Sequence, residues 1–309
     1  MHDTVHIPVL FHEVLEWSNA SPGKVFVDGT LGGAGHSILL LERIFPNGKL
    51  IGIDRDPRAI ERARKRLQEK SQELQTASGD QPKEDRDWFL LQGSYIDIPD
   101  RLKELGIERV DGILLDLGLS SDQLEDRERG FSFREDAPLD LRFDDRSGWT
   151  AADLLQHWPE KEIADAIYQY GEERYSRRIA KAIVEQRRSS PITTTKQLAD
   201  LVRRCVPGPN HGRIDKATRT FQALRIAVNQ ELEHLEQALA TLPRCLGPEG
   251  RFLIISFHSL EDRPVKHSFR EHELLSNLTK KPIVASDQET HQNPRSRSAK
   301  LRVAERKTL

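Results

Sequence analysis

The residues from Asp28 to Ser37 (DGTLGGAGHS) have the types and the spacing of a ligand-binding loop. An apolar run at 24–27 predicts a buried strand that ends at Asp28, and residues 36–45 predict a helix. Three glycines lie in the four positions 32–35 between them. Glycine lets a ligand approach the backbone closely, and a helix N-terminus attracts negative groups. The segment therefore predicts a nucleotide-type binding site at the end of a strand.

Two acids indicate which nucleotide this loop would bind. A dinucleotide fold uses G-x-G-x-x-G directly after its first strand, whereas this loop has an acid followed by G-x-x-x-G-G-x-G. Asp54 ends a second predicted strand, 22 residues after Gly32, where a carboxylate can accept both ribose hydroxyls. Asp28 would attract the ammonium of S-adenosylmethionine but would repel a pyrophosphate. The pattern favours S-adenosylmethionine over NAD, although Asp28 could instead be a helix N-cap.

Two more positions could serve such a cofactor. Tyr95 follows a third predicted strand and could pack on adenine, or it could be an ordinary core tyrosine. Asp116 ends a fourth predicted strand, at the carboxyl edge where open α/β sheets bind ligands. From there it could reach both the cofactor and a methyl acceptor.

The elements that position these residues alternate along the chain. Predicted strands at 24–27, 49–54, 88–91 and 110–117 alternate with helices, which predicts a parallel, doubly wound sheet. A loose surface loop is expected at 71–87. From about 120 to 215 only helices are predicted, so 121–215 is expected to be a helical insert between 1–120 and 216–309. A helix at 217–242, a strand at 251–257 and a final edge strand at 301–304 complete the predicted sheet domain.

Composition excludes some classes of protein. The formal net charge is −2, and the two cysteines, Cys205 and Cys245, have no metal-type or disulfide-rich spacing. No metal site is expected. The chain shows no signal peptide and no long apolar segment, so we expect a cytoplasmic protein without membrane contact.

Charge is nonetheless uneven along the chain. Residues 174–225 carry thirteen bases against three acids, and the last nineteen residues carry six bases against one acid. Such stretches are either solvated helix faces or surfaces that contact phosphates.

The chain resembles a known family in many ordered segments. It looks like the bacterial methyltransferases that modify N4 of a cytosine in 16S ribosomal RNA, the RsmH or MraW family. The matching segments are HIPVL at 6–10, the loop 28–37, IDRDP at 53–57, DGILLDLGLSSDQL at 111–124, RGFSF at 129–133, PLDLR at 138–142, YGEER at 170–174, TRTFQALRIAVN at 218–229, SFHSLEDR at 256–263 and NPRSRSAKLR at 293–302.

This resemblance implies a class I S-adenosylmethionine-dependent methyltransferase, with a Rossmann-like and mostly parallel sheet and an inserted helical domain. It also implies cofactor contacts, which fall on Ala34, Gly35, His36, Asp54, Tyr95, Asp116 and Gln123. Departures from the family pattern are small. Ala34 stands where the family usually has glycine, Tyr95 where phenylalanine is common, and Leu141 and Phe143 where methionines are usual.

Methyl transfer to a cytosine amine needs an in-line geometry and hydrogen-bond acceptors for the amine. Asp116 with the turn 118–121, which contains Ser120, is the first candidate for these acceptors. His258, at the end of the strand 251–257, is expected to contact the target nucleotide, or else to cap a turn. Glu261, Asp262 and Arg263 could form an ion-paired loop. Transfer to cytosine C5 usually needs a cysteine nucleophile, and neither cysteine follows a predicted strand.

The expected partner is 16S rRNA or the small ribosomal subunit. The helical insert with its basic run is expected to grip RNA, and Arg295, Arg297, Lys300 and Arg302 are expected to contact phosphates. Phe131 and Phe133 could pack on an extruded base, although seating the insert on the sheet is the simpler interpretation. The alternatives are a non-catalytic ribosome-assembly factor on a methyltransferase scaffold and, less favoured, a NAD-linked oxidoreductase.

Overall fold

The computed structural model describes residues 8–78, 87–146, 148–208 and 215–308, and these form two compact units. The first unit combines the chain up to Gly118 with the chain from Glu233 onward, and we call it the sheet unit. The second runs from Leu119 to Leu232, and we call it the helical unit.

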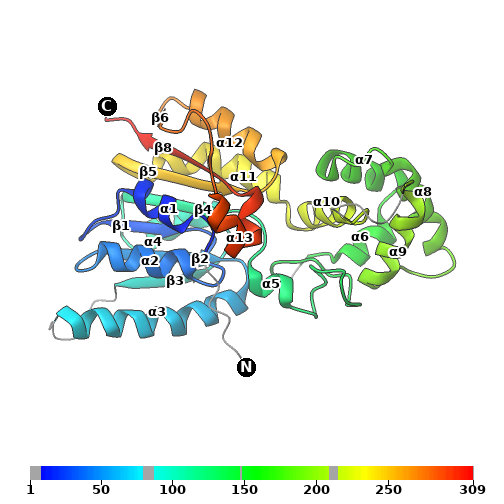
Figure 1. Ribbon diagram of the computed structural model, residues 1–309, viewed down its shortest axis with the longest axis horizontal. Coiled ribbons are helices and arrows are strands. Elements are labelled where there is room, and N and C mark those ends of the chain that lie inside the picture. Colours follow the sequence, from blue (N-terminus) through cyan, green and yellow to red (C-terminus); the bar gives the residue numbers. More distant parts are fainter. Residues whose placement is uncertain (1–7, 79–86, 147, 209–214, 309) are drawn as a thin grey trace. The chain divides into compact units, whose positions relative to one another are not determined.

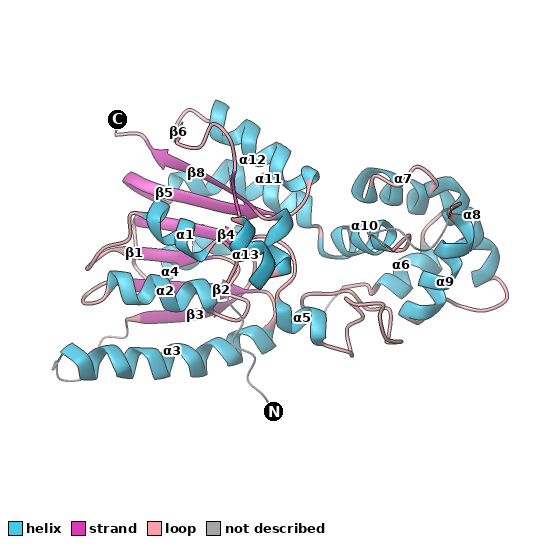
Figure 2. Ribbon diagram, in the orientation of Figure 1, coloured by secondary structure: helices cyan, strands magenta, loops and turns pink. Residues whose placement is uncertain are grey.

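The sheet unit contains a mostly parallel sheet whose strands follow the order β3-β2-β1-β4-β5-β8-β6 (Figures 1 and 2). The strands are β1 (Val25–Asp28), β2 (Lys49–Asp54), β3 (Trp88–Gln92), β4 (Val110–Asp116), β5 (Leu246–Ser256), β6 (Leu275–Asn277), β7 (Ile283–Val284) and β8 (Lys300–Arg306). Strands β1 to β5 pair in parallel, whereas β8 is antiparallel to both β5 and β6. The short β7 pairs only with β8.

Apolar strands are expected when helices cover both faces of a sheet. Along β4, Ile113 and Leu115 join one buried cluster, and Leu114 between them joins another. The first cluster packs against α4 (Ile98–Glu104), α11 (Glu231–Thr241) and α12 (Ser259–Glu271), and the second against α1 (Phe11–Ser18), α2 (Gly35–Ile44) and α3 (Pro57–Ser78). The expectation of a doubly wound sheet is therefore confirmed. Two short elements, η1 (Tyr95–Asp97) and α13 (Asp287–Gln292), also belong to the sheet unit.

The helical unit contains α5 (Ser121–Glu125), α6 (Ala151–His157), α7 (Glu160–Gly171), α8 (Ser176–Arg187), α9 (Thr195–Cys205) and α10 (Thr218–Asn229). It has its own core, to which these helices and the segment 131–143 contribute. Helix α7 packs on both α8 and α10, and α8 also packs on α9.

Three sequence-based predictions differ from this structure. The helix expected at 217–242 is two helices, because Gln230 has a left-handed backbone (φ 52°) that ends α10. Helix α10 packs in the helical unit, so that unit extends to Leu232 rather than to 215. Helix α3 continues to Ser78 where a loop was expected, and the rest of that expected loop, 79–86, lies outside the described residues.

The last strand was also predicted wrongly. Strand β8 lies between β5 and β6 instead of at the edge of the sheet. Its charged residue Arg302 is 4% exposed, because Asp262 pairs with it through two hydrogen bonds of 2.7 and 3.1 Å. A compensated cation can therefore occupy an interior strand.

Candidate active site

The glycine loop joins β1 to α2 in a tight, partly left-handed path. Gly32 and Ala34 have φ values of 48° and 61°. A Cβ on Gly29 would lie 2.5 Å from the Leu115 side chain, so only glycine fits there. Ala34 is 0% exposed and joins a small cluster with Leu31, Ile60 and Ala63. Its methyl group therefore faces the protein interior.

Asp28, at the end of β1, is 2% exposed. Its carboxylate accepts a hydrogen bond of 2.6 Å from the Ser37 hydroxyl and one of 3.2 Å from the Thr30 N–H. Burial raises its pKa, and these hydrogen bonds oppose the rise. The N-cap of α2 is Ala34, so the alternative of Asp28 as a simple N-cap is not what the structure has.

Asp54, at the end of β2, joins the strand to the glycine loop. One carboxylate oxygen accepts from the Gly32 N–H and the other from the Asp56 N–H, each at 2.8 Å. Burial raises the pKa of Asp54 to about 6. A carboxylate oxygen can accept more than one hydrogen bond, so both oxygens keep the capacity to accept from two hydroxyl groups of a ribose.

Asp116, at the end of β4, has an unsatisfied oxygen. Its Oδ1 is buried and has no hydrogen-bond partner among the described residues, although the side chain as a whole is 26% exposed. Its backbone N–H donates to the Thr30 hydroxyl at 2.6 Å, which ties β4 to the glycine loop. Burial raises the pKa of Asp116 well above its ordinary value, and the negative charges of Asp28 and Glu261 add to the rise.

His36, in the first turn of α2, lies beside Asp116 with 3.7 Å between Nδ1 and Oδ2. Its Nε2 lies 2.9 Å from the Val9 carbonyl, which can only accept, so we assign the proton to Nε2. Burial lowers the pKa of His36. The ring is therefore neutral near pH 7, and its contact with Asp116 is not an ion pair.

His258 and Glu261 lie where β5 passes into α12. Glu261 is 3% exposed, and its Oε2 accepts from the Phe257 N–H at 2.8 Å. Its Oε1 lies 3.2 Å from Nε2 of His258, but neither ring nitrogen of His258 has a well-aligned hydrogen bond. His258 is the N-cap residue of α12, and its carbonyl accepts from the Glu261 and Asp262 N–H groups, so the residue caps this turn through its backbone although its side chain makes no cap bond.

Glu261 was not a candidate site residue on sequence grounds, where it was only part of an expected ion-paired loop. The structure has a helix there instead of a loop, since these residues lie in the first turns of α12. Asp262 pairs with Arg302, whereas Glu261 faces His258 and its charge acts on Asp116. The spacing of three residues between His258 and Glu261 at the start of a helix could have indicated it.

Tyr95 follows β3 as the first residue of η1. Its ring meets the ring of His234 edge-on, with the centroids 6.5 Å apart, and it packs at the margin of the sheet core. Its Cβ would be 2.9 Å from a Cβ placed on Gly29, so it lies beside the glycine loop. The tyrosine is only partly buried, which leaves both interpretations of it open.

The sheet unit thus gathers Gly35, His36, Asp54, Tyr95, Asp116 and His258 near the carboxyl ends of its strands, around the buried Ala34. Ser120 and Gln123 belong to the helical unit instead. They form a capping box on α5, in which the Ser120 hydroxyl accepts from the Gln123 N–H and the Gln123 side chain accepts from the Ser120 N–H. This pairing fixes both side chains.

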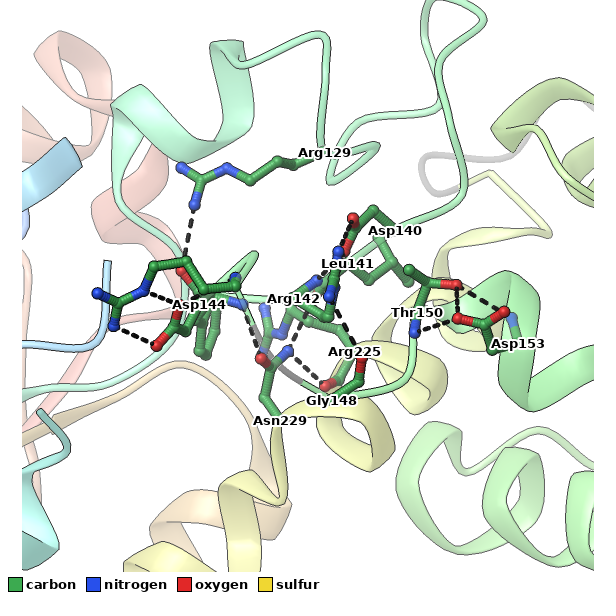
Figure 3. A network of polar contacts seen from close by, with 12 residues as sticks. Arg129, Asp140, Leu141, Arg142, Asp144, Gly148, Thr150, Asp153, Arg225 and Asn229 are labelled. Atoms are coloured by element: carbon green, nitrogen blue, oxygen red, sulfur yellow. Dashed lines mark hydrogen bonds and ion pairs between the residues drawn. The ribbon is translucent and has the colours of Figure 1, made fainter. Parts of the chain in front are cut away.

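A second polar network holds the segments 129–146 and 148–150 of the helical unit (Figure 3). Leu141 has a left-handed backbone (φ 65°). Asn229 on α10 donates to the Leu141 carbonyl at 2.7 Å and accepts from the Phe143 N–H at 2.8 Å. Arg129, 2% exposed, donates to the Phe143 carbonyl at 3.2 Å. The segment is therefore fixed to α10 through its backbone.

Phe131 and Phe133 are part of the core of the helical unit. Phe131 stacks on Phe143 with centroids 5.7 Å apart, and Phe133 packs on Phe221 at 4.6 Å. Phe131 is 6% exposed. Their packing stabilises the helical unit itself, and seating on the sheet, the simpler interpretation above, is not needed to explain them.

The predicted phosphate contacts near the C-terminus divide into two groups. Arg302 is buried in its pair with Asp262, so the prediction for Arg302 is wrong. Lys300 lies 3.9 Å from the same carboxylate. Arg295 and Arg297 are exposed, so the prediction that they contact phosphates still stands as a prediction.

Among residues 8–78, 87–146, 148–208 and 215–308, no group of three or more His, Cys, Asp or Glu side chains could hold a metal ion. Across those same ranges, none of the helices has both the length and the apolar character that crossing a membrane requires.

Comparison with known proteins identifies the family. Residues 3–307 match the family described as "MraW methylase family". The chain is 49% identical to a protein of Trichlorobacter lovleyi named "Ribosomal RNA small subunit methyltransferase H", with 99% of each chain covered. It is 50% identical to a protein of the same name from Deinococcus radiodurans, with 97% of this chain and 89% of that one covered.

These matches confirm the expected enzyme class, the class I Rossmann-like fold and the use of S-adenosylmethionine. They extend over both units, and nearly every described residue lies within them. The chain therefore belongs to the MraW methylase family.

Proposed function

We propose that this protein transfers the methyl group of S-adenosylmethionine to the N4 amino group of a cytidine in the RNA of the small ribosomal subunit. Relatives with about half of their residues identical carry the name of a ribosomal RNA small subunit methyltransferase, which supports the substrate class. The choice of N4 depends on the site itself.

The observation that carries the proposal is the unsatisfied Oδ1 of Asp116. A buried polar atom without a partner is uncommon and calls for a ligand group to complete it. The exocyclic amine of cytosine is a hydrogen-bond donor with a delocalised lone pair. An acceptor for its N–H groups favours the pyramidal geometry that the nitrogen adopts as it attacks the methyl carbon.

Residues that would bind the cofactor lie at or just after the ends of strands in the sheet unit. S-adenosylmethionine supplies an electrophilic methyl group on a positively charged sulfur. Asp54 would accept the ribose hydroxyls, the glycine loop would allow close approach of the backbone, and Tyr95 would pack on adenine. The carboxylates of Asp28 and Asp116 would supply the negative field that a cationic ligand requires.

Asp116 is also suited to accept the proton that must leave the methylated nitrogen. The methylated nitrogen carries an extra proton, which it gives up easily. A carboxylate with a raised pKa is a better acceptor for that proton than an ordinary one. His36 is held neutral, with its unprotonated Nδ1 toward Asp116, so it does not compete by donating to the carboxylate. His258 would contact the target nucleotide from the end of β5.

Methylation at cytosine C5 is disfavoured by the cysteines. That route needs a thiolate, and burial raises the pKa of both Cys205 and Cys245. Each cysteine lies in an apolar cluster, Cys205 in the helical unit and Cys245 in the sheet unit.

The test is the position of the methyl group on the product. Purified protein, S-adenosylmethionine and unmodified 16S rRNA made by transcription are incubated, and the RNA is digested to nucleosides for mass spectrometry against N4- and C5-methylcytidine standards. We expect N4-methylcytidine alone. C5-methylcytidine would refute the choice of acceptor. The absence of any methylated nucleoside, with assembled small subunits as well as with free RNA, would favour a non-catalytic assembly factor.

A further inference from the structure

The basic run at 174–225 is not uniform in the structure. Many of its cations are already neutralised or used to hold the fold. Arg203 pairs with Asp200 and Asp215, and Arg225 pairs with Glu231. Arg187 donates to two backbone carbonyls. These residues stabilise the helical unit and are not available to a ligand.

A second group of cations has no such partner. Arg174, Arg177, Arg178 and Arg204 are exposed, and none of them lies within 4.0 Å of a carboxylate in the part of the chain that the structure describes. We call these four residues the arginine patch. The only undescribed segment near them in sequence, 209–214, contains no acid.

The patch is assembled from the start of α8 and the end of α9, two helices that pack together. Cys205 is the common neighbour. Burial raises the pKa of its thiol, and the charges of Arg178 and Arg204 oppose that rise. Glu185, which acts on the same thiol in the opposite direction, is paired at 3.9 Å with Lys181. Arg178 on α8 and Arg204 on α9 therefore both act on the Cys205 thiol, although they are distant in sequence.

The start of α8 does not compensate this charge. The first turn of α8 contains no acid, and its N-cap residue Tyr175 makes no side-chain cap bond. The positive end of the helix dipole adds to the field of Arg177 and Arg178. The buried Glu173 lies beside the patch, but its carboxylate accepts from the Tyr175 N–H. Concentrated like charge costs stability unless an anion shares the surface.

The side chains are suited to phosphate. All four are arginines, whose planar guanidinium groups bind phosphate oxygens in pairs. Arg174 lies over the Tyr175 ring at 4.9 Å, so its stem is partly ordered before any ligand arrives.

We propose that the arginine patch binds the phosphodiester backbone of the RNA substrate through Arg174, Arg177, Arg178 and Arg204, and that Arg187, Arg203 and Arg225, which hold the fold, do not. This assignment rests on the proposed function for the identity of the polyanion. It predicts contacts to phosphates, which position RNA, and none to bases.

The test is the salt dependence of RNA binding. The variant with Arg177→Gln, Arg178→Gln and Arg204→Gln is compared with wild-type protein on the unmodified 16S transcript. Each lost phosphate contact lowers the slope of log affinity against log salt concentration by about 0.7 for single-stranded RNA, so a reduction of about 2 is expected. Affinity for S-adenosylmethionine, measured by calorimetry, is expected to be unchanged.

The matched control removes the same charge from cations that have carboxylate partners. It carries Arg127→Gln, Arg146→Gln and Lys161→Gln, whose side chains are 77, 58 and 87% exposed and paired with Glu135, Asp144 and Asp165. We expect its slope to stay near the wild-type value. An equal fall in the control, or an unchanged slope in the patch variant, would overturn the assignment.

A charge-preserving variant guards against loss of folding. Arg177→Lys with Arg178→Lys is expected to keep most of the slope while it loses affinity, because lysine cannot make the paired contact. A loss of slope in this variant would contradict a phosphate role.

The salt dependence of binding and the methylation assay together distinguish a failure of the patch proposal from a failure of the proposed function. Methylated cytidine with a patch-independent slope would refute the patch alone. A patch-dependent slope without methyl transfer would refute the proposed function alone.

Discussion

The two units differ in how far their functional charged side chains are exposed to water. In the sheet unit, Asp28 is buried and Asp54 and Asp116 are half-buried at strand ends, and burial raises the pKa of each. In the helical unit, Arg174, Arg177, Arg178 and Arg204 remain in water without carboxylate partners. A buried acid acts strongly on a small ligand at one point, whereas exposed cations act additively on a long polyanion.

The three acids of the sheet unit also differ from one another. Both oxygens of Asp54 and both of Asp28 have hydrogen-bond partners, whereas Oδ1 of Asp116 has none. The carboxylates that already hold the glycine loop suit cofactor binding, and the one with an unpartnered oxygen suits a group that arrives during the reaction.

The largest effect should therefore come from Asp116→Asn. The amide keeps the shape of the side chain but loses the negative charge and the capacity to take a proton. We expect methyl transfer in single-turnover assays to slow by roughly 10²-fold or more, the range of a positioned proton acceptor. Affinity for S-adenosylmethionine should fall much less. Transfer within threefold of wild type would remove Asp116 from the reaction.

Glu261→Gln tests the negative field behind Asp116. The amide keeps a donor and an acceptor beside the Phe257 N–H and His258 but removes a charge that raises the pKa of Asp116. That pKa should fall, so the acidic limb of the rate profile should move to lower pH. Asp262→Asn is the neighbouring control, because Asp262 pairs with Arg302 and is not a cause of the Asp116 shift. A profile that does not move would assign Glu261 to structure alone.

In the helical unit, Asn229→Ala should be the most damaging change of a single side chain. Asn229 is 1% exposed and bonds to the Leu141 carbonyl, the Phe143 N–H and the Arg225 carbonyl. Its loss leaves buried backbone groups unpaired at about 1–3 kcal/mol each where water cannot reach them. We expect the free energy of unfolding to drop by roughly 2–3 kcal/mol in urea titrations.

The control for this change is Gln222→Ala on the same helix. Gln222 is half-buried and donates a hydrogen bond of 3.2 Å to the Tyr170 carbonyl. It should cost far less than Asn229→Ala. Equal losses would show that the network around Leu141 is not a special support of the unit.

Asp54 gives a pH dependence of opposite sign for binding and for stability. Its pKa rises from 3.8 to about 6 on folding, so between these values the folded chain holds more protons than the unfolded chain. Its contribution to the free energy of unfolding therefore grows as the pH falls through this window. Ribose hydroxyls donate to the ionised form, so affinity for S-adenosylmethionine should weaken below pH 6, by up to about tenfold per pH unit.

Calorimetry between pH 5 and 8 checks this, with Asp54→Asn as the comparison. The variant should bind more weakly at pH 7 and should lose most of the dependence on pH. A wild-type affinity that is constant from pH 5 to 8 would show that Asp54 does not meet the ribose.

Much of the sheet could be predicted because strands buried on both faces read as apolar runs, as at 49–54 and 110–116. The turn at Gln230 could not, because it contains neither glycine nor proline to mark the end of α10. The interior place of β8 was hidden by Arg302, whose partner Asp262 lies forty positions away in sequence. Acids at strand ends were correctly placed at one edge of the sheet, but the contact between Glu261 and His258 needed the start of α12.

Ala34→Gly should have the smallest effect on stability and on cofactor affinity. It tests the difference between side chains that are buried in the glycine loop and groups that face a ligand. Alanine in a left-handed conformation is strained by about 1–2 kcal/mol. Glycine relieves this strain but loses the buried methyl group, about 0.8 kcal/mol, and gains up to about 1 kcal/mol of unfolded-state freedom. These terms nearly cancel. The free energy of unfolding should therefore change by less than about 1 kcal/mol.

Affinity for S-adenosylmethionine should be unchanged in the same variant, because the methyl group of Ala34 is enclosed by Leu31, Ile60 and Ala63 and does not face a ligand. Calorimetric titration of the wild-type protein and of the Ala34→Gly variant with S-adenosylmethionine measures this affinity. A fivefold change would mean that the loop opens when it binds, so that a residue enclosed in the free protein reaches the cofactor. The buried and the ligand-facing parts of the loop would then exchange roles during binding, and the binding site would form only when the cofactor arrives.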